Sequence, residues 1–303
     1  MEIVAGADRN TGMVKAEVSK RTQDLTPGDV QQGNQSWWST NPMTYDWHGN
    51  LAEQKYSRGW FDEIDARFIR GARLFATDRQ PFDQILPLDR LSGASVLEIG
   101  CGMGLHTETM VRAGARVTAV DLSDTAIQAT SQRLALKGLS ARVMQLDAEH
   151  LPFPDQSFDF VWSWGVIHHS ARTARIVRHI ARLLRPTGEC RVMVYNREST
   201  AARVAFIKDY LLSGAFLHRT FDEVLYRTSD GFSARFFVRE HFEDLFRAFF
   251  ENVSSEVMGQ EADVIPLPRQ LRAIALKLAP ESYLRQAQSR RGLFIFVQAS
   301  SPN

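Results

Sequence analysis

The sequence has few of the residues that mark disulfide-bonded, metal-binding or membrane-spanning proteins. Its 303 residues include two cysteines, Cys101 and Cys190, which supply neither a disulfide framework nor a metal-ligand cluster. No metal site is therefore predicted. No run of about 18 apolar residues is present, so no membrane span is expected. Residues 1–36 lack the apolar core of a secretory signal, which favours a cytoplasmic location.

An excess of positive charge is also missing. The 36 Lys and Arg residues nearly balance the 35 Asp and Glu residues, and the formal net charge is +1. Proteins that bind nucleic acid generally carry a basic surface. We therefore expect no nucleic-acid partner and favour a small-molecule substrate.

A glycine-rich turn follows a short apolar run. Residues 96–104 read VLEIGCGMG, and residues 117–121 read VTAVD. The first run has the length of a buried parallel strand, and a helical pattern follows it, so the turn lies where doubly wound sheets bind ligands. Asp121, at the end of the second strand, can accept hydrogen bonds from vicinal ribose hydroxyls. The two runs together predict a nucleoside site.

The spacing of the glycines separates two common cofactors. A dinucleotide fingerprint reads Gly-x-Gly-x-x-Gly, and its third glycine position, counted from Gly100, is occupied by Leu105. The chain has Gly-x-Gly-x-Gly instead. Glu98 places an acid near the turn, which suits a ligand that carries an amino group and a sulfonium. This pattern favours S-adenosylmethionine over a nicotinamide dinucleotide.

These motifs resemble those of the class I S-adenosylmethionine-dependent methyltransferases. The resemblance covers roughly residues 94–196 and continues, in the expected order, through LDAE at 146–149, LPF at 151–153, SFDFV at 157–161 and LLRPTG at 183–188. It implies that the cofactor is S-adenosylmethionine. The residues assigned to the cofactor site are Glu98, Gly100, Gly102, Gly104, Asp121, Leu122, Asp147, Ala148 and Ser163.

The roles within this set follow from the resemblance. It places Gly100, Gly102 and Gly104 beside the methionine moiety and Asp121 at the ribose. It places Asp147, with the alanine after it, at the adenine. Asp147 also starts a loop, where an aspartate can simply cap a turn, and this alternative stays open.

The pattern along the chain predicts an α/β fold with a doubly wound, mostly parallel seven-stranded sheet and helical cap elements. Strands are expected near 95–99, 116–120, 141–146, 158–163, 189–195, 252–258 and 293–299. We predict a flexible arm over 1–36, an aromatic helical cap over 37–90, and a methyltransferase domain over 91–303 with a cap insertion at about 200–238. The insertion is dense in phenylalanine and tyrosine.

Candidate catalytic residues follow the fourth and fifth strands. His168 and His169 lie in a loop expected to face the crevice, and either histidine can act as a general base or simply orient the loop. His169 is preferred. Tyr195 and Glu198, at the end of the fifth strand, are further candidates.

Three residues are expected to bind the acceptor. Trp47 and Trp164 would contribute to an aromatic wall, and Arg197 would hold an anionic group, unless it forms a surface ion pair.

The sequence is interpreted as an enzyme that methylates a small, partly apolar metabolite. The acceptor atom, whether oxygen, nitrogen or carbon, is left open, and so is a homodimer. The rival interpretations are a non-catalytic S-adenosylmethionine-binding partner subunit and an RNA or protein methyltransferase. A nicotinamide-dependent reductase ranks last because the glycine spacing opposes it.

Overall fold

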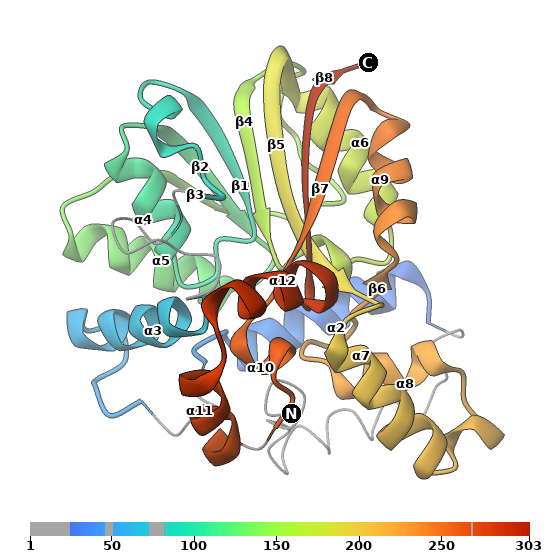
Figure 1. Ribbon diagram of the computed structural model, residues 1–303. Coiled ribbons are helices and arrows are strands. Elements are labelled where there is room, and N and C mark those ends of the chain that lie inside the picture. Colours follow the sequence, from blue (N-terminus) through green and yellow to red (C-terminus); the bar gives the residue numbers. More distant parts are fainter. Residues whose placement is uncertain (1–24, 46–50, 73–81, 83, 268) are drawn as a thin grey trace.

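The computed structural model describes residues 25–45, 51–72, 82, 84–267 and 269–303, which form a central β-sheet with helices on both faces (Figure 1). Its main path has the order β3-β2-β1-β4-β5-β8-β7. The strands are β1 (Ser95–Ile99), β2 (Arg116–Asp121), β3 (Arg142–Gln145), β4 (Phe158–Trp164), β5 (Leu184–Asn196), β7 (Phe250–Met258) and β8 (Phe294–Pro302). The predicted seven-stranded sheet is confirmed. A two-residue strand that the sequence pattern did not predict, β6 (Phe236–Phe237), pairs with the end of β5.

Strand direction determines where a ligand can bind. The pairs β3-β2, β2-β1, β1-β4 and β4-β5 are parallel, whereas β8 is antiparallel to both β5 and β7. From β1 the chain first builds outward to β2 and β3, and it then returns to place β4 on the other side of β1. Such a reversal opens a crevice at the carboxyl ends of the strands.

Two apolar cores lie on opposite faces of the sheet, because side chains alternate along each strand. Leu97 of β1 packs in the core covered by α6 (Thr173–Leu183) and α9 (Arg239–Arg247). Val96 packs in the other core, with α4 (Leu105–Arg112) and a segment that includes η3 (Leu88–Arg90). Helix α5 (Asp124–Leu136) contributes Ile127 to this second core. The sheet is therefore buried on both faces, as a parallel sheet requires.

The last part of the predicted N-terminal arm is helical. Residues 27–36 belong to helix α2 (Pro27–Thr40), and only residues 1–24 of the expected arm lie outside the described residues. Thr26 and Asp29 form a reciprocal capping box, and Pro27 occupies the first turn. Asn34 and Trp37 are buried. Capping and burial thus outweigh the polar composition that suggested a flexible segment.

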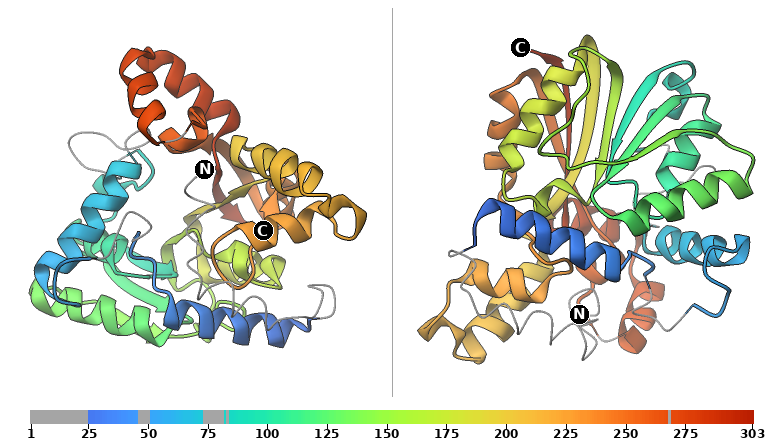
Figure 2. Two further views of the ribbon diagram at one scale, coloured as in Figure 1. Left: turned by 90° about the horizontal axis from the view of Figure 1, so that it is seen from below. Right: turned by 180° about the vertical axis from the view of Figure 1, so that it is seen from behind.

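Several cap elements gather below the carboxyl ends of the parallel strands, where α2 crosses beneath them (Figures 1 and 2). Helix α3 (Arg58–Gly71) comes from the predicted 37–90 cap. The insertion after β5 forms α7 (Thr200–Ala205), the π-helix η5 (Phe206–Leu212), η6 (Ala215–Leu217) and α8 (Phe221–Thr228). A third group of helices connects β7 to β8 in the chain: α10 (Glu261–Val264), α11 (Arg269–Leu278) and α12 (Glu281–Arg291). Among the described helices, none combines the length and hydropathy needed to cross a membrane.

Candidate active site

A cavity of about 240 Å³ lies at the carboxyl edge of the sheet. Its wall combines the glycine-rich turn, the ends of β2, β4 and β5, and side chains from α2 and α3. Nine of the residues predicted for the site line it: Gly100, Gly102, Asp121, Leu122, Asp147, Ala148, Trp164, His169 and Tyr195. Most of the predicted cofactor residues are thus brought together.

The backbone of the glycine turn needs residues without a side chain. Gly100 has φ of 84°, and a Cβ atom there would lie 2.1 Å from Cγ2 of Val166. Gly102 has φ of 50° with open space where its Cβ would be, so a ligand can approach this backbone closely. Gly104 differs from the prediction, because it does not line the cavity. It begins α4 and packs against Thr130 of α5.

Asp121 is held in place between the glycine turn and the end of β2. Its carboxylate accepts the backbone N–H of Gly102 at 3.0 Å and that of Ser123 at 2.9 Å. Burial raises the pKa of Asp121, and these amide hydrogen bonds partly offset the shift. A carboxylate fixed beside the turn can accept hydrogen bonds from a ribose diol.

Asp147 caps the turn after β3 and also faces the cavity, and its contact with adenine stays a prediction. Its Oδ1 accepts the backbone N–H of Glu149 at 2.8 Å, which caps the turn after β3. The same oxygen accepts the side-chain amide of Gln31 at 2.7 Å, so α2 is tied to this wall of the cavity. Asp147 and Gln31 both line the cavity.

Two predicted cofactor residues lie beneath the cavity and do not line it. Glu98 is buried at the end of β1, where its carboxyl group accepts the hydroxyl of Thr107. Burial raises the pKa of Glu98 to about 8. Ser163 is also buried and donates to the carbonyl oxygen of Ile99 at 3.2 Å. Strand side chains alternate, so Glu98 lies on the sheet face of Val96 and Ser163 lies on the opposite face, with Leu97.

The two histidines of η4 (Ile167–His169) differ in position. His169 lines the cavity, and its Nδ1 bonds to the carbonyl oxygen of Ser233. A carbonyl only accepts, so Nδ1 carries the proton and Nε2 carries the lone pair of the neutral ring.

His168 is fully buried between the rings of His169 and Tyr195, with centroid separations of 4.2 and 4.1 Å. Burial lowers its pKa well below the usual range. The predicted catalytic role of His168 therefore has no support from its position, because the ring does not reach the cavity wall.

Tyr195 lies at the end of β5 and also lines the cavity. Its hydroxyl donates to the carboxylate of Asp230, with distances of 2.8 and 3.0 Å to the two oxygens. Burial raises the pKa of Tyr195, and the nearby charge of Asp230 raises it further. Asp230 comes from the insertion, so this hydrogen bond joins the insertion to the end of β5.

The remaining predicted residues lie elsewhere. Arg197 pairs with Asp222 at 2.9 Å and covers the ring of Phe221, so it forms the surface ion pair that the sequence left open. Glu198 is exposed and does not line the cavity. The chain turns away after β5, where Ser199 caps α7. Trp47 lies outside the described residues, so its predicted role is unchanged.

The sequence interpretation missed the contribution of α2. Gln31, Asn34 and Trp38 line the cavity. The buried Asn34 donates to the backbone oxygen of His169 at 2.7 Å and accepts the N–H of Ser233 at 3.3 Å. It thereby joins α2, the η4 loop and the insertion. The capping box at Thr26 was the available signal for a helix here.

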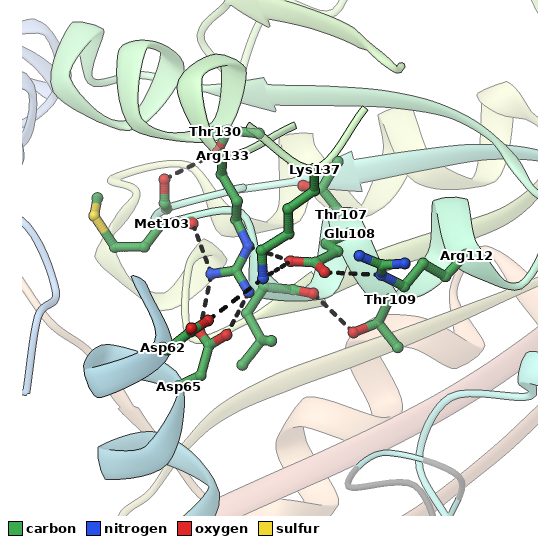
Figure 3. Close-up of polar contacts among 12 residues, drawn as sticks. Asp62, Asp65, Met103, Thr107, Glu108, Thr109, Arg112, Thr130, Arg133 and Lys137 are labelled. Carbon is green, nitrogen blue, oxygen red and sulfur yellow. Dashed lines mark hydrogen bonds and ion pairs between the residues drawn. The ribbon is translucent and has the colours of Figure 1, made fainter. Parts of the chain in front are cut away.

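A cluster of buried charged side chains contacts the glycine turn at the backbone of Met103 (Figure 3). Arg133 of α5 is fully buried and donates to Glu108 of α4 at 2.7 Å and to Asp65 of α3 at 2.9 Å. It also reaches the backbone oxygen of Met103, at 3.4 Å. Lys137 approaches Glu108 at 2.9 Å. The cluster fixes three helices around the turn.

The family of the domain follows from its sequence. Residues 97–192 match the family model of a methyltransferase domain. This match identifies a methyltransferase domain within the chain. Its matched region begins in β1 and ends in β5, so it includes the glycine turn, Asp121, Asp147 and both histidines.

Two curated relatives are similar in sequence to more than half of this chain. The 27-O-demethylrifamycin SV methyltransferase of Amycolatopsis mediterranei (strain S699) is 32% identical over 170 residues, which span 54% of this chain and 57% of that protein. The ubiquinone biosynthesis O-methyltransferase of Mesorhizobium japonicum is 29% identical over 197 residues, spanning 63% of this chain and 73% of that protein. The chain therefore spans little more than half the length of the first relative.

A solved structure extends the likeness beyond the matched domain. The [4+2]-cyclase SpnF covers 90% of this chain and 97% of its own, with a TM-score of 0.51 and 19% identity. At this identity the likeness concerns the fold alone. Because that protein is named as a cyclase, the reaction must be argued from the site.

Proposed function

We propose that this chain transfers a methyl group from S-adenosylmethionine to a small, partly apolar metabolite, in the cytoplasm. The observation that carries the proposal is the fixed carboxylate of Asp121 beside the open backbone of Gly102, on the wall of the cavity. The names of both curated relatives describe methyltransferases, one of 27-O-demethylrifamycin SV and one of ubiquinone biosynthesis. They support a small-molecule acceptor.

The residues present fit the cofactor. Asp121 would hold the ribose, the backbone of Gly100 and Gly102 would lie along the methionine moiety, and Asp147 would accept from the adenine amino group. When bound, S-adenosylmethionine supplies an electrophilic methyl group. Helix α2 would limit the access of water, since Gln31 holds it against Asp147.

His169 is the proposed general base for an acceptor whose proton must be removed. Its Nε2 carries the lone pair because Nδ1 bonds to Ser233, and the ring lines the cavity. Asn34 and Ser233 would orient the imidazole. A crystal structure with S-adenosylhomocysteine tests this role. Nε2 of His169 must lie on the side of the cofactor sulfur from which the methyl group is transferred.

Calorimetric titration with S-adenosylhomocysteine tests the cofactor proposal. We expect wild type to bind it in preference to the reduced nicotinamide dinucleotide. The Asp121→Ala variant should lose at least about tenfold in affinity, because hydrogen bonds to a charged group contribute about 1.5–3 kcal/mol. Asp124→Ala, an exposed aspartate three residues on, is the matched control and should bind like wild type.

Preference for the dinucleotide, or equal affinities in all three proteins, would contradict the proposal. A non-catalytic cofactor-binding subunit would bind S-adenosylhomocysteine but show no turnover with any acceptor. An RNA or protein acceptor would need a basic surface at the cavity mouth. The homodimer stays a prediction, which sedimentation equilibrium of the purified chain tests.

A further inference from the structure

Asp230 is a cavity carboxylate with an unusual set of partners. It lines the cavity and accepts the Tyr195 hydroxyl at 2.8 and 3.0 Å. Among the described residues, none forms an ion pair with it. No lysine or arginine is found among the described residues that line the cavity.

The other three lining aspartates are compensated by the protein. Asp65 pairs with the buried guanidinium of Arg133. Asp121 accepts two backbone amides, at 3.0 and 2.9 Å. Asp147 accepts one backbone amide and the side chain of Gln31. Asp230 differs from these three aspartates. In the described structure its hydrogen-bond donor is one neutral side chain, the phenol of Tyr195.

Aromatic side chains line the same cavity as this carboxylate. The rings of Tyr195 and Phe294 are stacked, with their centroids 6.3 Å apart. The centroid of the Phe294 ring lies 5.8 Å from that of Trp164. Tyr45 contributes a second phenol to the cavity wall. All four rings line the cavity.

This combination favours a cationic ligand for two reasons. Aromatic faces attract ammonium groups, most strongly where water is excluded. A carboxylate that loses its water to an incoming apolar ligand is costly unless that ligand supplies a positive charge. An anionic ligand would instead meet an uncompensated negative charge.

We infer that Asp230, held by Tyr195 in a cavity that Tyr45, Trp164 and Phe294 also line, is the acceptor subsite for a protonated amine. The inference rests on the proposed methyl transfer and narrows its acceptor to an amine-bearing apolar molecule. The amine binds this subsite as an ammonium group, so it positions the acceptor. The atom that receives the methyl group is a separate part of the molecule.

Three small probes that differ in one group test the inference. 2-Phenylethylamine, 2-phenylethanol and 3-phenylpropionate are titrated into wild type saturated with S-adenosylhomocysteine. The amine should bind at least about tenfold more tightly than the alcohol, as one charge-assisted contact provides, and the acid should bind most weakly. Asp230→Asn should abolish the preference while S-adenosylhomocysteine affinity stays within about twofold of wild type.

Asp222→Asn is the matched control, because Asp222 is an exposed acid of the same insertion that pairs with Arg197. It should keep the amine preference. Equal binding of amine and alcohol, no binding of the amine, or a preference that survives in Asp230→Asn would overturn the inference. A large loss of S-adenosylhomocysteine affinity in Asp230→Asn would overturn it too, because Asp230 would then belong to the cofactor site. Failure of wild type to bind S-adenosylhomocysteine would instead refute the proposed function.

Discussion

Glu98 and Asp121 are two carboxyl groups near one glycine turn, and their surroundings give them different roles. Asp121 lines the cavity and accepts two backbone amides. Glu98 lies below the turn and accepts the Thr107 hydroxyl, while burial raises its pKa from 4.5 to about 8. Glu98 is therefore largely protonated in the ligand-free fold at neutral pH.

The raised pKa of Glu98 predicts a pH-dependent stability. The folded chain keeps this proton between pH 4.5 and about 8, whereas the unfolded chain loses it. The stabilisation from the protonated group is complete below pH 4.5 and is lost as the pH rises toward 8. Between pH 5 and 8, we expect wild type to lose about 2–4 kcal/mol of unfolding free energy relative to Glu98→Gln.

Urea denaturation of the ligand-free proteins at several pH values measures this difference. Glu251→Gln, which changes an exposed glutamate of β7, should follow the wild-type pH dependence. Parallel curves for wild type and Glu98→Gln would show that Glu98 does not titrate in this range.

At the residue scale, local spacing identified residues that the structure brings together. Gly100 and Gly102 follow from the turn after β1, Asp121 follows from the end of β2, and all three line the cavity. Glu98 and Ser163 are buried and do not line the cavity, so their predicted cofactor contacts stay predictions. An Asp-Gly pair such as Asp230-Gly231 is common in turns, so the sequence alone does not mark Asp230 as a cavity residue.

The helices around the glycine turn depend on buried charges as well as apolar packing. Arg133 joins α3, α4 and α5 through Asp65 and Glu108 (Figure 3). Arg112 also pairs with Glu108, at 2.8 Å, but its side chain is 54% exposed whereas that of Arg133 is 1% exposed. Of the two arginines that pair with Glu108, Arg133 is buried and Arg112 is exposed.

This pair of partners predicts two very different stability effects. Arg133→Met should lower the free energy of unfolding by about 3–5 kcal/mol, because Asp65 and Glu108 would lose a buried cation. Arg112→Ala should cost at most about 1 kcal/mol, as exposed ion pairs do. Urea denaturation at pH 7 compares them. Similar losses in both variants would contradict the role given to burial.

At the element scale, periodicity predicted the strands and the helices that cover the sheet. Helix α6 shows why, since Ile176, Val177, Ile180 and Leu183 form the apolar stripe expected from the sequence and are all buried. Helix α2 was missed, because its buried face is short and its clearest signal is the capping box at Thr26. Glu198 does not line the cavity, because the chain turns into α7 directly after β5.

The whole molecule encloses the cavity with segments that are far apart in sequence. Gln31 and Asp147 are 116 residues apart and hydrogen-bonded at 2.7 Å, and Asn34 bonds to Ser233 across 199 residues. Helix α2, the η4 loop and the insertion after β5 are joined through such contacts. A single sequence contains no signal for these pairings, so the aromatic cap could be expected but its arrangement could not.

The most direct test of the account is a crystal structure of the chain with S-adenosylhomocysteine. We predict the ribose hydroxyls on Asp121, the adenine beside Asp147, and the sulfur facing His169 and Tyr195. Ligand density elsewhere, or an adenine placed among Tyr45, Trp164 and Phe294, would contradict both the cofactor site and the acceptor side assigned to this cavity.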